Sequence, residues 1–543
     1  MNFINMNGYS EFHNASLTYN GLYGLIHNGA GRLDFKNDVI SFKSKEAYVK
    51  SNPLYVKGFV KINNNLDFEI ESNKANADDI LLIINNSELL KEVKQGIAIL
   101  KEASGVVKLA VNIKAKIVPV PFGHPPLPPE EAFEDMKVKG RVELNNNSCF
   151  IDGFYTPLNN LKGIVNFTET IVDFNNLNAV SGSSELNIKG KVINDLKSKI
   201  PDVDLTITSE KEKLKDTIKF LTESYMYPDN YPDISVLYNI ASVHDLYFKY
   251  KAKAIDFLPD KVYAIMNFIP DKEENPIKAK SGRVIMEKST VKVENVKATL
   301  FDSELNINGN VQNVNTINPL YNLKIAVNNF NLENLNDTSK VTILPENLDN
   351  ILKKFTKYKG FTDIDIALNK NILQGNINLK QPQFIDNTTK IPFISEDFSI
   401  IFKDNKLLID NIAGTIGNIP FFGDFIIYDY IKNPKIEGYF TSKLKNEFIK
   451  TYLNDELKKN LIIDGDISLS SKIKGGINTL ELEPKLTLNP QSDIYYIGTN
   501  IGDINEKREL SGQINIKENI ININNFNYTK YVSSQNNKTY PLV

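Results

Sequence analysis

The chain has 543 residues, a formal net charge of −3 at pH 7 and 24% charged residues. This length is too great for one compact core, so it predicts three or four domains, or an elongated repeat protein whose units pack on their neighbours. The lack of a basic excess argues against a nucleic-acid partner, and a single cysteine, Cys149, rules out an internal disulfide. Asparagine and lysine are abundant, as an AT-rich genome would produce, so single residues of these types receive little weight.

The N-terminal segment alternates and turns from its first residues. It has neither the basic start nor the apolar core of a signal peptide. The longest apolar run in this region, Ile80 to Ile84, is far shorter than the roughly 18 residues that a membrane-spanning helix requires. We therefore expect residues 1–30 to be part of a preceding repeat and the chain to be a fragment of a longer protein.

A stretch of sequence then recurs along the chain. "GRLDFKNDVISFKSKEAYVKSNPLYVKG", from Gly31 to Gly58, returns in pattern from Gly163 to Gly190 and from Gly282 to Gly309. A fourth copy has Phe398 at the first glycine position, and a fifth begins at Gly512. These anchors predict repeats over 31–162, 163–281, 282–397 and 398–511, and a partial fifth over 512–543. The recurrent glycines are expected to serve turns and bulges at strand ends; they are Gly31, Gly58, Gly163, Gly190, Gly282, Gly309, Gly423 and Gly512.

Within each copy apolar residues alternate with polar residues, and short polar turns such as "KND" and "TET" separate the runs. This pattern predicts antiparallel strands with one apolar face. The apolar positions that recur are Leu33, Phe35, Phe42, Val165, Phe167, Phe174, Val284, Met286, Val293, Ile400, Phe402 and Ile409.

One amphipathic helix is expected after each of the first four copies, followed by two or more strands. The first lies near 79–102 with Leu89, Val93, Ile97 and Leu100 on one stripe, and the second carries Leu214, Ile218 and Leu221 behind a capping box from Ser209 to Glu212. The third carries Leu348, Leu352 and Phe355, and the fourth Leu444, Phe448 and Tyr452. A proline-rich loop over 118–133 is expected to act as a stiff spacer.

The fold predicted from these elements is mainly β: an elongated, repetitive antiparallel sheet rolled into a groove, with about one short helix per repeat. A flat sheet of this many strands would curl or split. So few helices are too little cover for the apolar face. Either the sheet closes on itself around a dry core, or the face stays partly open and holds an apolar ligand.

No pattern for chemistry accompanies the repeat. His13, His27, His124 and His244 lack metal-ligand spacing and are expected at the surface or in turns. No phosphate-binding glycine loop or nucleophile elbow is present. The sequence therefore indicates no enzyme, no metal and no cofactor.

The recurrent pattern resembles the AsmA-like family, which includes TamB and YhdP. "LNNLKGIVNFTETIVDFNNLNAVSGSSELNIKGKV" carries the likeness most clearly. The resemblance implies a β-groove lined by apolar residues in the periplasm or cell envelope of a diderm bacterium, usually anchored in the inner membrane. It implies phospholipid or another acyl-chain lipid as the partner, together with the inner and outer membranes and outer-membrane assembly proteins.

The leading hypothesis is a passive conduit that carries lipid acyl chains along the apolar face toward the outer membrane. One alternative is an assembly factor for outer-membrane proteins that uses an exposed sheet edge. Another is a surface β-solenoid, either an adhesin or a carbohydrate-active enzyme; a repeat of 114 to 132 residues that contains a helix argues against this.

Overall fold

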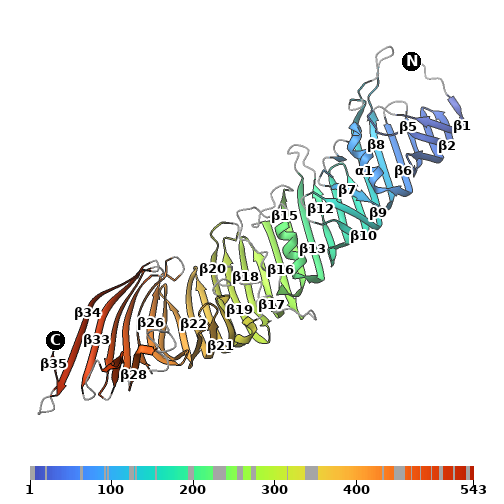
Figure 1. Cartoon of the computed structure of the whole chain (residues 1–543). Coiled ribbons are helices and arrows are strands. Elements are labelled where there is room, and N and C mark those ends of the chain that lie inside the picture. The colour runs from blue at the N-terminus through green and yellow to red at the C-terminus, as the bar shows by residue number, and fades with distance from the viewer. Residues whose placement is uncertain are drawn as a thin grey trace. The chain divides into compact units, whose positions relative to one another are not determined.

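The computed structural model describes most of the chain. The described residues are 6–18, 21–61, 65–90, 93–94, 97–98, 100–120, 127–128, 131–152, 156–193, 201–223, 240–253, 261–270, 277–314, 316–336, 352–430, 433–444, 459–465, 467–476, 479–490, 492–500, 506–517, 520–533 and 539–542. The chain divides into two units (Figure 1). Unit 1 comprises Met1–Glu273, Ala279–Lys292 and Gln312–Pro319, and unit 2 comprises Glu274–Lys278, Val293–Val311 and Leu320–Val543.

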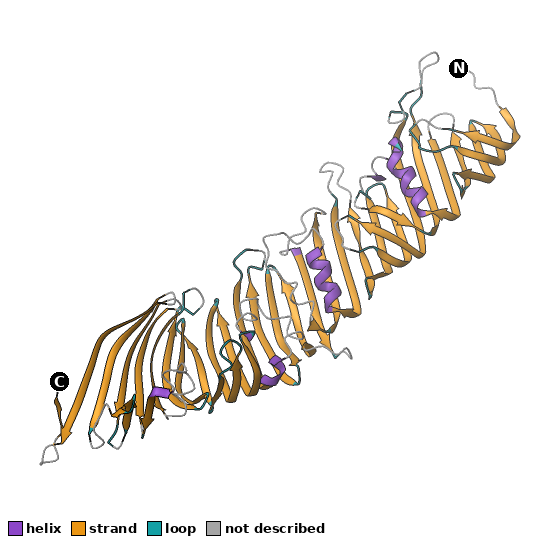
Figure 2. Ribbon diagram, in the orientation of Figure 1, coloured by secondary structure: helices purple, strands orange, loops and turns teal. Residues whose placement is uncertain are grey.

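Strands dominate both units (Figure 2), as the period-two pattern predicts. The earlier strands are β1 (Met6–Leu17), β2 (Ile26–Asn37), β3 (Val39–Val49), β4 (Asn52–Pro53), β5 (Tyr55–Lys61), β6 (Asn65–Asn76), β7 (Leu100–Ser104), β8 (Val106–Ile117), β9 (Phe133–Ile151), β10 (Leu158–Thr168), β11 (Ile171–Ser181), β12 (Ser184–Ile193), β13 (Asp202–Lys213), β14 (Ile240–Ala241), β15 (Val243–Lys253), β16 (Val262–Ile269) and β17 (Ile277–Glu287). Those that follow are β18 (Thr290–Leu300), β19 (Ser303–Gln312), β20 (Leu320–Asn331), β21 (Phe355–Asn369), β22 (Ile372–Asp386), β23 (Pro392–Ser395), β24 (Phe398–Lys403), β25 (Lys406–Ile416), β26 (Ile419–Tyr428), β27 (Lys435–Leu444), β28 (Leu461–Asp464), β29 (Ile467–Gly476), β30 (Thr479–Leu488), β31 (Asp493–Tyr496), β32 (Thr499–Asn500), β33 (Lys507–Lys517), β34 (Ile520–Ser533) and β35 (Thr539–Leu542).

The strands pair antiparallel, mostly with their neighbours in sequence. In unit 1 the ladder runs β1–β2–β3–β5–β6–β8–β9–β10–β11–β12–β13–β15–β16–β17. In unit 2 it runs β20–β21–β22–β24–β25–β26–β27–β29–β30–β33–β34–β35, and β28, β31 and β32 form a small separate sheet. The mainly β, repetitive antiparallel sheet is therefore confirmed.

The repeat copies begin at equivalent places in the strand order. Gly31, Gly163 and Gly282 lie in β2, β10 and β17, Phe398 opens β24, and Gly512 lies in β33. The first two anchors stand in strands that are followed by hairpin partners of similar length, β3 and β11, whereas the six-residue β24 is followed by the eleven-residue β25. The repeat boundaries themselves stay a prediction.

Asparagine-containing β-bulges divide many strands into two parts. The register shifts between Phe174 and Leu177 around Asn176, and between Ile409 and Ile412 around Asn411. Both asparagines have φ of 55°, in the left-handed region that asparagine tolerates. Because a bulge inserts one residue, the apolar residues on both sides of it face the same side of the sheet.

The buried side chains gather beyond these bulges. In unit 1 they include Leu158, Leu161, Leu177, Ala179 and Ile188, which form one cluster. The unit 2 cluster contains Ala298, Leu305, Val327, Phe330, Leu332 and Tyr358. We call this buried set the covered row.

Short helices accompany the covered row. Helix α1 (Ala77–Asn86) contacts β6 and β7, and α3 (Leu214–Glu223) contacts β13 and β14. The 3-10 helix η4 (Leu332–Asn336) packs Leu332 and Leu335 into the unit 2 cluster. In the described residues, α1 thus lies against β6 and β7, α3 against β13 and β14, and η4 against the unit 2 cluster.

The first expected helix is displaced. Helix α1 ends at Asn86, a short 3-10 helix η1 (Glu88–Leu90) follows, and Leu100 opens strand β7. The expected span of 79–102 was therefore wrong. The side chains of Asn86 and Ser87 donate hydrogen bonds to the carbonyls of Leu82 and Ile83, where a continuing helix would place backbone donors.

The second helix is confirmed as α3, but its capping box is not. Ser209 and Glu212 lie in β13, which stays paired with β15 up to Lys213, so the helix starts directly from a strand. The third helix was expected to carry Phe355, but Phe355 is the first residue of strand β21. Leu348, expected on the same helix, lies outside the described residues. For the fourth, Leu444 ends β27, and Phe448 and Tyr452 lie outside the described residues.

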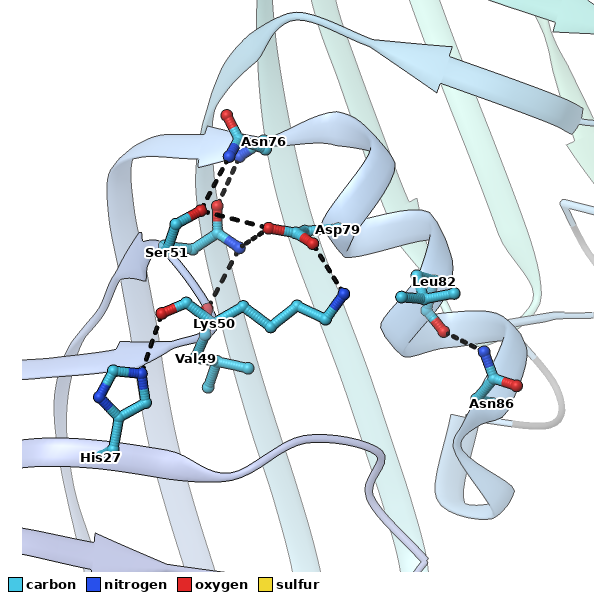
Figure 3. A network of polar contacts seen from close by, with 9 residues as sticks. His27, Val49, Lys50, Ser51, Asn76, Asp79, Leu82 and Asn86 are labelled. Atoms are coloured by element: carbon cyan, nitrogen blue, oxygen red, sulfur yellow. Dashed lines mark hydrogen bonds and ion pairs between the residues drawn. The ribbon is translucent and has the colours of Figure 1, made fainter.

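Both α-helices are attached through an aspartate in their first turn. Asp79 accepts hydrogen bonds from Lys50 Nζ at 2.9 Å and Ser51 Oγ at 3.4 Å, and Asn76 Nδ2 donates to Ser51 Oγ at 3.0 Å (Figure 3). Asn52 Nδ2 adds a bond to Asp79 at 3.0 Å. The contact ties α1 to the turn between β3 and β4.

Helix α3 repeats this attachment. Asp216, also the third residue of its helix, accepts hydrogen bonds from the backbone N–H of Ser183 at 3.2 Å and the hydroxyl of Ser184 at 3.5 Å. Ser183 and Ser184 occupy the turn between β11 and β12, which is the same turn of the next repeat copy. We call this feature the aspartate latch.

Candidate binding surface

An unbroken apolar row crosses the strands of unit 1 on the side of the covered row. Direct cross-strand partners lie side by side on the same face of a sheet. One chain of such partners is Val56, Ile70, Val111, Gly140, Phe167, Val172, Val192, Val203 and Ala252. The adjacent chain is Leu109, Val142, Val165, Phe174, Gly190, Leu205, Tyr250 and Val262. We call these rows and their direct extensions strip 1.

Unit 2 carries an equivalent surface, strip 2. Its first chain of partners is Ile325, Ile366, Gly375, Phe402, Leu407, Ile427, Ile436, Gly475, Leu480, Ile516 and Ile521. Its second is Val327, Ile364, Ile377, Ile400, Ile409, Phe425, Gly438, Ile473, Leu482, Ile514 and Ile523. With about 4.8 Å between strands, these rows extend for roughly 50 Å within the unit.

The opposite face of the sheet carries the charges. Lys57 and Glu69 pair at 2.9 Å across β5 and β6, and Lys114 pairs with Asp67 at 2.8 Å. These residues alternate with strip residues along the same strands. The two faces of the sheet therefore differ sharply in polarity.

Most strip side chains are half-buried, whereas the covered row is buried. Four strip residues, which lie at the ends of their rows or beside the covered row, are buried as well: Val192, Tyr250, Val262 and Val327. Phe35, Phe167, Ile400 and Phe402 all retain partial exposure, and so do their strip neighbours Val111 and Leu407. A dry core between two layers would bury such residues fully. In the described residues, the strips thus show the exposure of a sheet face that neighbouring side chains shield but no second layer covers.

The accessible surface of the chain supports this interpretation. It is 32485 Å², whereas two separate compact bodies of half this mass would together expose roughly 24,000 Å². The difference does not depend on how the two units are placed. The fold therefore leaves much more surface in contact with solvent than compact domains do.

The residues singled out in the sequence lie on these surfaces. Strip 1 and its direct extensions contain Leu33, Phe35, Phe42, Val165, Phe167, Phe174, Val284 and Met286, and strip 2 contains Ile400, Phe402 and Ile409. Val293 is half-buried in β18, before the left-handed Asn295. The structure thus places eleven of the twelve predicted residues on the strips and their extensions, where Val165 and Phe174 also pack against the covered row.

The recurrent glycines lie inside strands, which corrects their expected role in turns at strand ends, although Gly31, Gly163 and Gly512 lie at register shifts, in agreement with the expected bulges. Their strands are β2 for Gly31, β5 for Gly58, β10 for Gly163, β12 for Gly190, β17 for Gly282, β19 for Gly309, β26 for Gly423 and β33 for Gly512. Gly58 pairs with Phe42 and Phe68, and Gly190 pairs with Phe174 and Leu205. These glycines leave room beside large apolar neighbours.

A buried polar chain that the sequence did not reveal lies under α3. Thr217 Oγ1 is 2.9 Å from Glu212 Oε1 and 3.0 Å from His244 Nε2, and His244 Nδ1 donates to the carbonyl of Asp245 at 2.8 Å. His244 is fully buried, so its expected surface position was wrong. Burial raises the pKa of Glu212 to about 7, with a smaller contribution from Asp216, while the bond from Thr217 opposes this. Burial also lowers the pKa of His244.

Other candidate chemical groups do not assemble into a site. His13 and His27 are not buried, and His124 lies outside the described residues. Burial raises the pKa of the Cys149 thiol to about 11, which disfavours the reactive thiolate. Among the described residues, no group of three or more His, Cys, Asp or Glu side chains could hold a metal ion, and no helix is long and apolar enough to cross a membrane.

Comparison with known proteins adds no relative. No protein-family model matches the chain, and neither the curated proteins nor the solved structures give a significant match. The interpretation of this surface therefore depends on its own geometry.

Proposed function

We propose that the chain is an AsmA-like cell-envelope protein whose strips bind phospholipid acyl chains and conduct them between the inner and outer membranes. The observation that carries the proposal is the unbroken succession of apolar cross-strand partners across each unit, most of which are half-exposed. Acyl chains are long, flexible and without hydrogen-bonding groups. This matches rows whose side chains are almost all hydrocarbon; the one hydroxyl in the two rows of strip 1, that of Tyr250, donates to the carbonyl of Lys253.

The strips favour movement along them over release from them. Burying a methylene group contributes about 0.8 kcal/mol, so an acyl chain that leaves the strip loses that contribution from each contact. A shift from Val111 to Gly140 and Phe167 replaces one apolar contact by another. Transport is then passive, with no residue performing covalent chemistry.

The first experiment is lipid extraction and mass spectrometry of the full chain purified without detergent. Wild type is expected to carry phospholipid, and a triple variant with Phe35→Asp, Phe167→Asp and Phe402→Asp is expected to lose most of it. The carboxylates would interrupt both strips with groups that are costly to desolvate.

A matched control places the same change on the opposite face. Phe59, Phe361 and Phe422 are exposed by 39%, 42% and 40%, and they alternate with strip positions. Their replacement by aspartate should leave the bound lipid unchanged. A folded, monodisperse wild type without lipid would contradict the proposal and favour an assembly role.

A further inference from the structure

Phenylalanine rings on the strips lie over glycines of the neighbouring strand. A methyl group added at Gly140 would lie 2.3 Å from Cζ and 2.6 Å from Cε1 of Phe167. Such distances leave no room for any side chain between the ring and the backbone. Rings also lie over Gly58 (Phe68), Gly31 (Phe12) and Gly438 (Phe425), with nearest ring atoms at 2.5 to 2.6 Å, but there a backbone carbonyl oxygen is as near or nearer, at 2.3 to 2.5 Å.

The arrangement affects how far the phenylalanine rings project from the sheet. Side chains on a strand stand roughly perpendicular to the sheet, so an upright phenylalanine would rise above the valines beside it. Phe167 has Val172 as one cross-strand partner and Gly140 as the other. Its ring occupies the space above Gly140, where a larger neighbour would force it upright.

Backbone strain does not explain the glycine at this position. Gly140 has no left-handed φ, whereas Gly190, for example, has φ of 156° and Asp204 O at 2.2 Å from its added methyl group. At Gly140 the two nearest atoms belong to the Phe167 ring, and the carbonyl oxygen of Ala110 follows at 2.9 Å. The missing side chain therefore mainly accommodates the ring.

We propose that these glycine–phenylalanine pairs keep the strips level, so that an acyl chain can pass each ring as it moves across the strands. This inference rests on the proposed function. It makes Gly140 a positioning residue that acts through Phe167. It also separates binding, which needs apolar contact, from passage, which needs a level surface.

The test makes two measurements on each variant. One is the rate at which it transfers a fluorescent phosphatidylethanolamine from donor to acceptor phosphatidylcholine vesicles, and the other is the amount of lipid bound per chain. Gly140→Ala should slow transfer several-fold, by a much larger factor than any change in the lipid bound per chain. Combining it with Phe167→Leu should restore the wild-type rate, because no ring is left to be raised. A glycine needed only for folding would not be rescued in this way.

A second pair of variants keeps the test independent of the folding of Gly140→Ala. Val165 pairs with Val142 and Phe174 and has no glycine beside it. Val165→Phe adds a ring that has no glycine partner to lie over, and should slow transfer several-fold more than Val165→Leu does.

Two results would overturn the inference while leaving lipid binding intact. One is a wild-type transfer rate in folded Gly140→Ala, or in Val165→Phe if Gly140→Ala does not fold. The other is a double variant as slow as Gly140→Ala. Failure of the proposed function itself looks different, because the wild type would then carry no lipid and transfer none.

Discussion

Individual asparagines hold the left-handed backbone conformation at β-bulges, a role that the amino-acid composition does not show. Of the 25 described non-glycine residues with positive φ, 13 are asparagine, including Asn176, Asn329 and Asn411 at register shifts. Asparagine enters the left-handed region more readily than most residues with a side chain. Its abundance therefore partly reflects the bulges that turn the apolar residues of each strand to one face.

The titration of Glu212 should change the stability of helix α3 measurably. Its pKa is raised from 4.5 to about 7, so its stabilising contribution is complete below pH 4.5 and is lost as the pH rises through 7. We expect the opening free energy of α3, measured by hydrogen exchange, to fall by up to about 3 kcal/mol over this range.

Glu212→Gln is the matched control for this titration. The amide keeps the hydrogen-bonding shape without the charge, so the decrease with rising pH should disappear. The remaining pH dependence of the opening free energy should come from His244. Because burial lowers the pKa of His244 below 6.5, its contribution to stability is present above pH 6.5 and is lost as the pH falls. An unchanged pH profile in Glu212→Gln would refute the assignment.

At the scale of the element, the aspartate latch fixes where each helix lies. Asp79→Ala removes the bonds from Lys50, Ser51 and Asn52, and should destabilise the attachment of α1 by about 1–2 kcal/mol. Hydrogen exchange of the backbone amides of residues 77–86 would measure this loss as a lower opening free energy of α1. Because Lys50 chiefly holds the pKa of Asp79 below its ordinary 3.8, this contribution is present above that pH and lost as the pH falls.

Asp78→Ala is the control for the latch, since Asp78 is the exposed neighbour in the same turn. It should change the opening free energy by less than about 0.5 kcal/mol. Equal effects of the two substitutions would show that helix-terminal charge, rather than the latch, stabilises α1.

The strands were predictable from sequence because alternation is a local signal. Leu33 and Phe35 indicate the face of β2 without any knowledge of their neighbours. The latch was not predictable, because Asp79 meets a turn 27 to 29 residues earlier in the chain. The buried position of His244 likewise depends on α3 and β13, which contact it only in the folded sheet.

At the scale of the whole molecule, exposed strips should make the chain associate when no ligand covers them. We expect the delipidated protein to sediment as concentration-dependent oligomers, and the triple aspartate variant on Phe35, Phe167 and Phe402 to stay monomeric. Sedimentation velocity would distinguish the two. A monomeric delipidated wild type at all concentrations would show that the strips are shielded in solution.

Successive side chains of a strand point to opposite faces of the sheet, so a shift by one residue exchanges the two faces and a shift by two restores them. In β12 the covered-row residue Ile188 and the strip residues Gly190 and Val192 are interleaved with Lys189 and Lys191. Deleting one residue ahead of them would turn the lysines onto the strip, whereas deleting two would restore the face. Repeats can therefore vary freely in the length of their loops, whereas an odd insertion or deletion inside a strand requires a bulge, such as those at Asn176 and Asn411, to keep the apolar face.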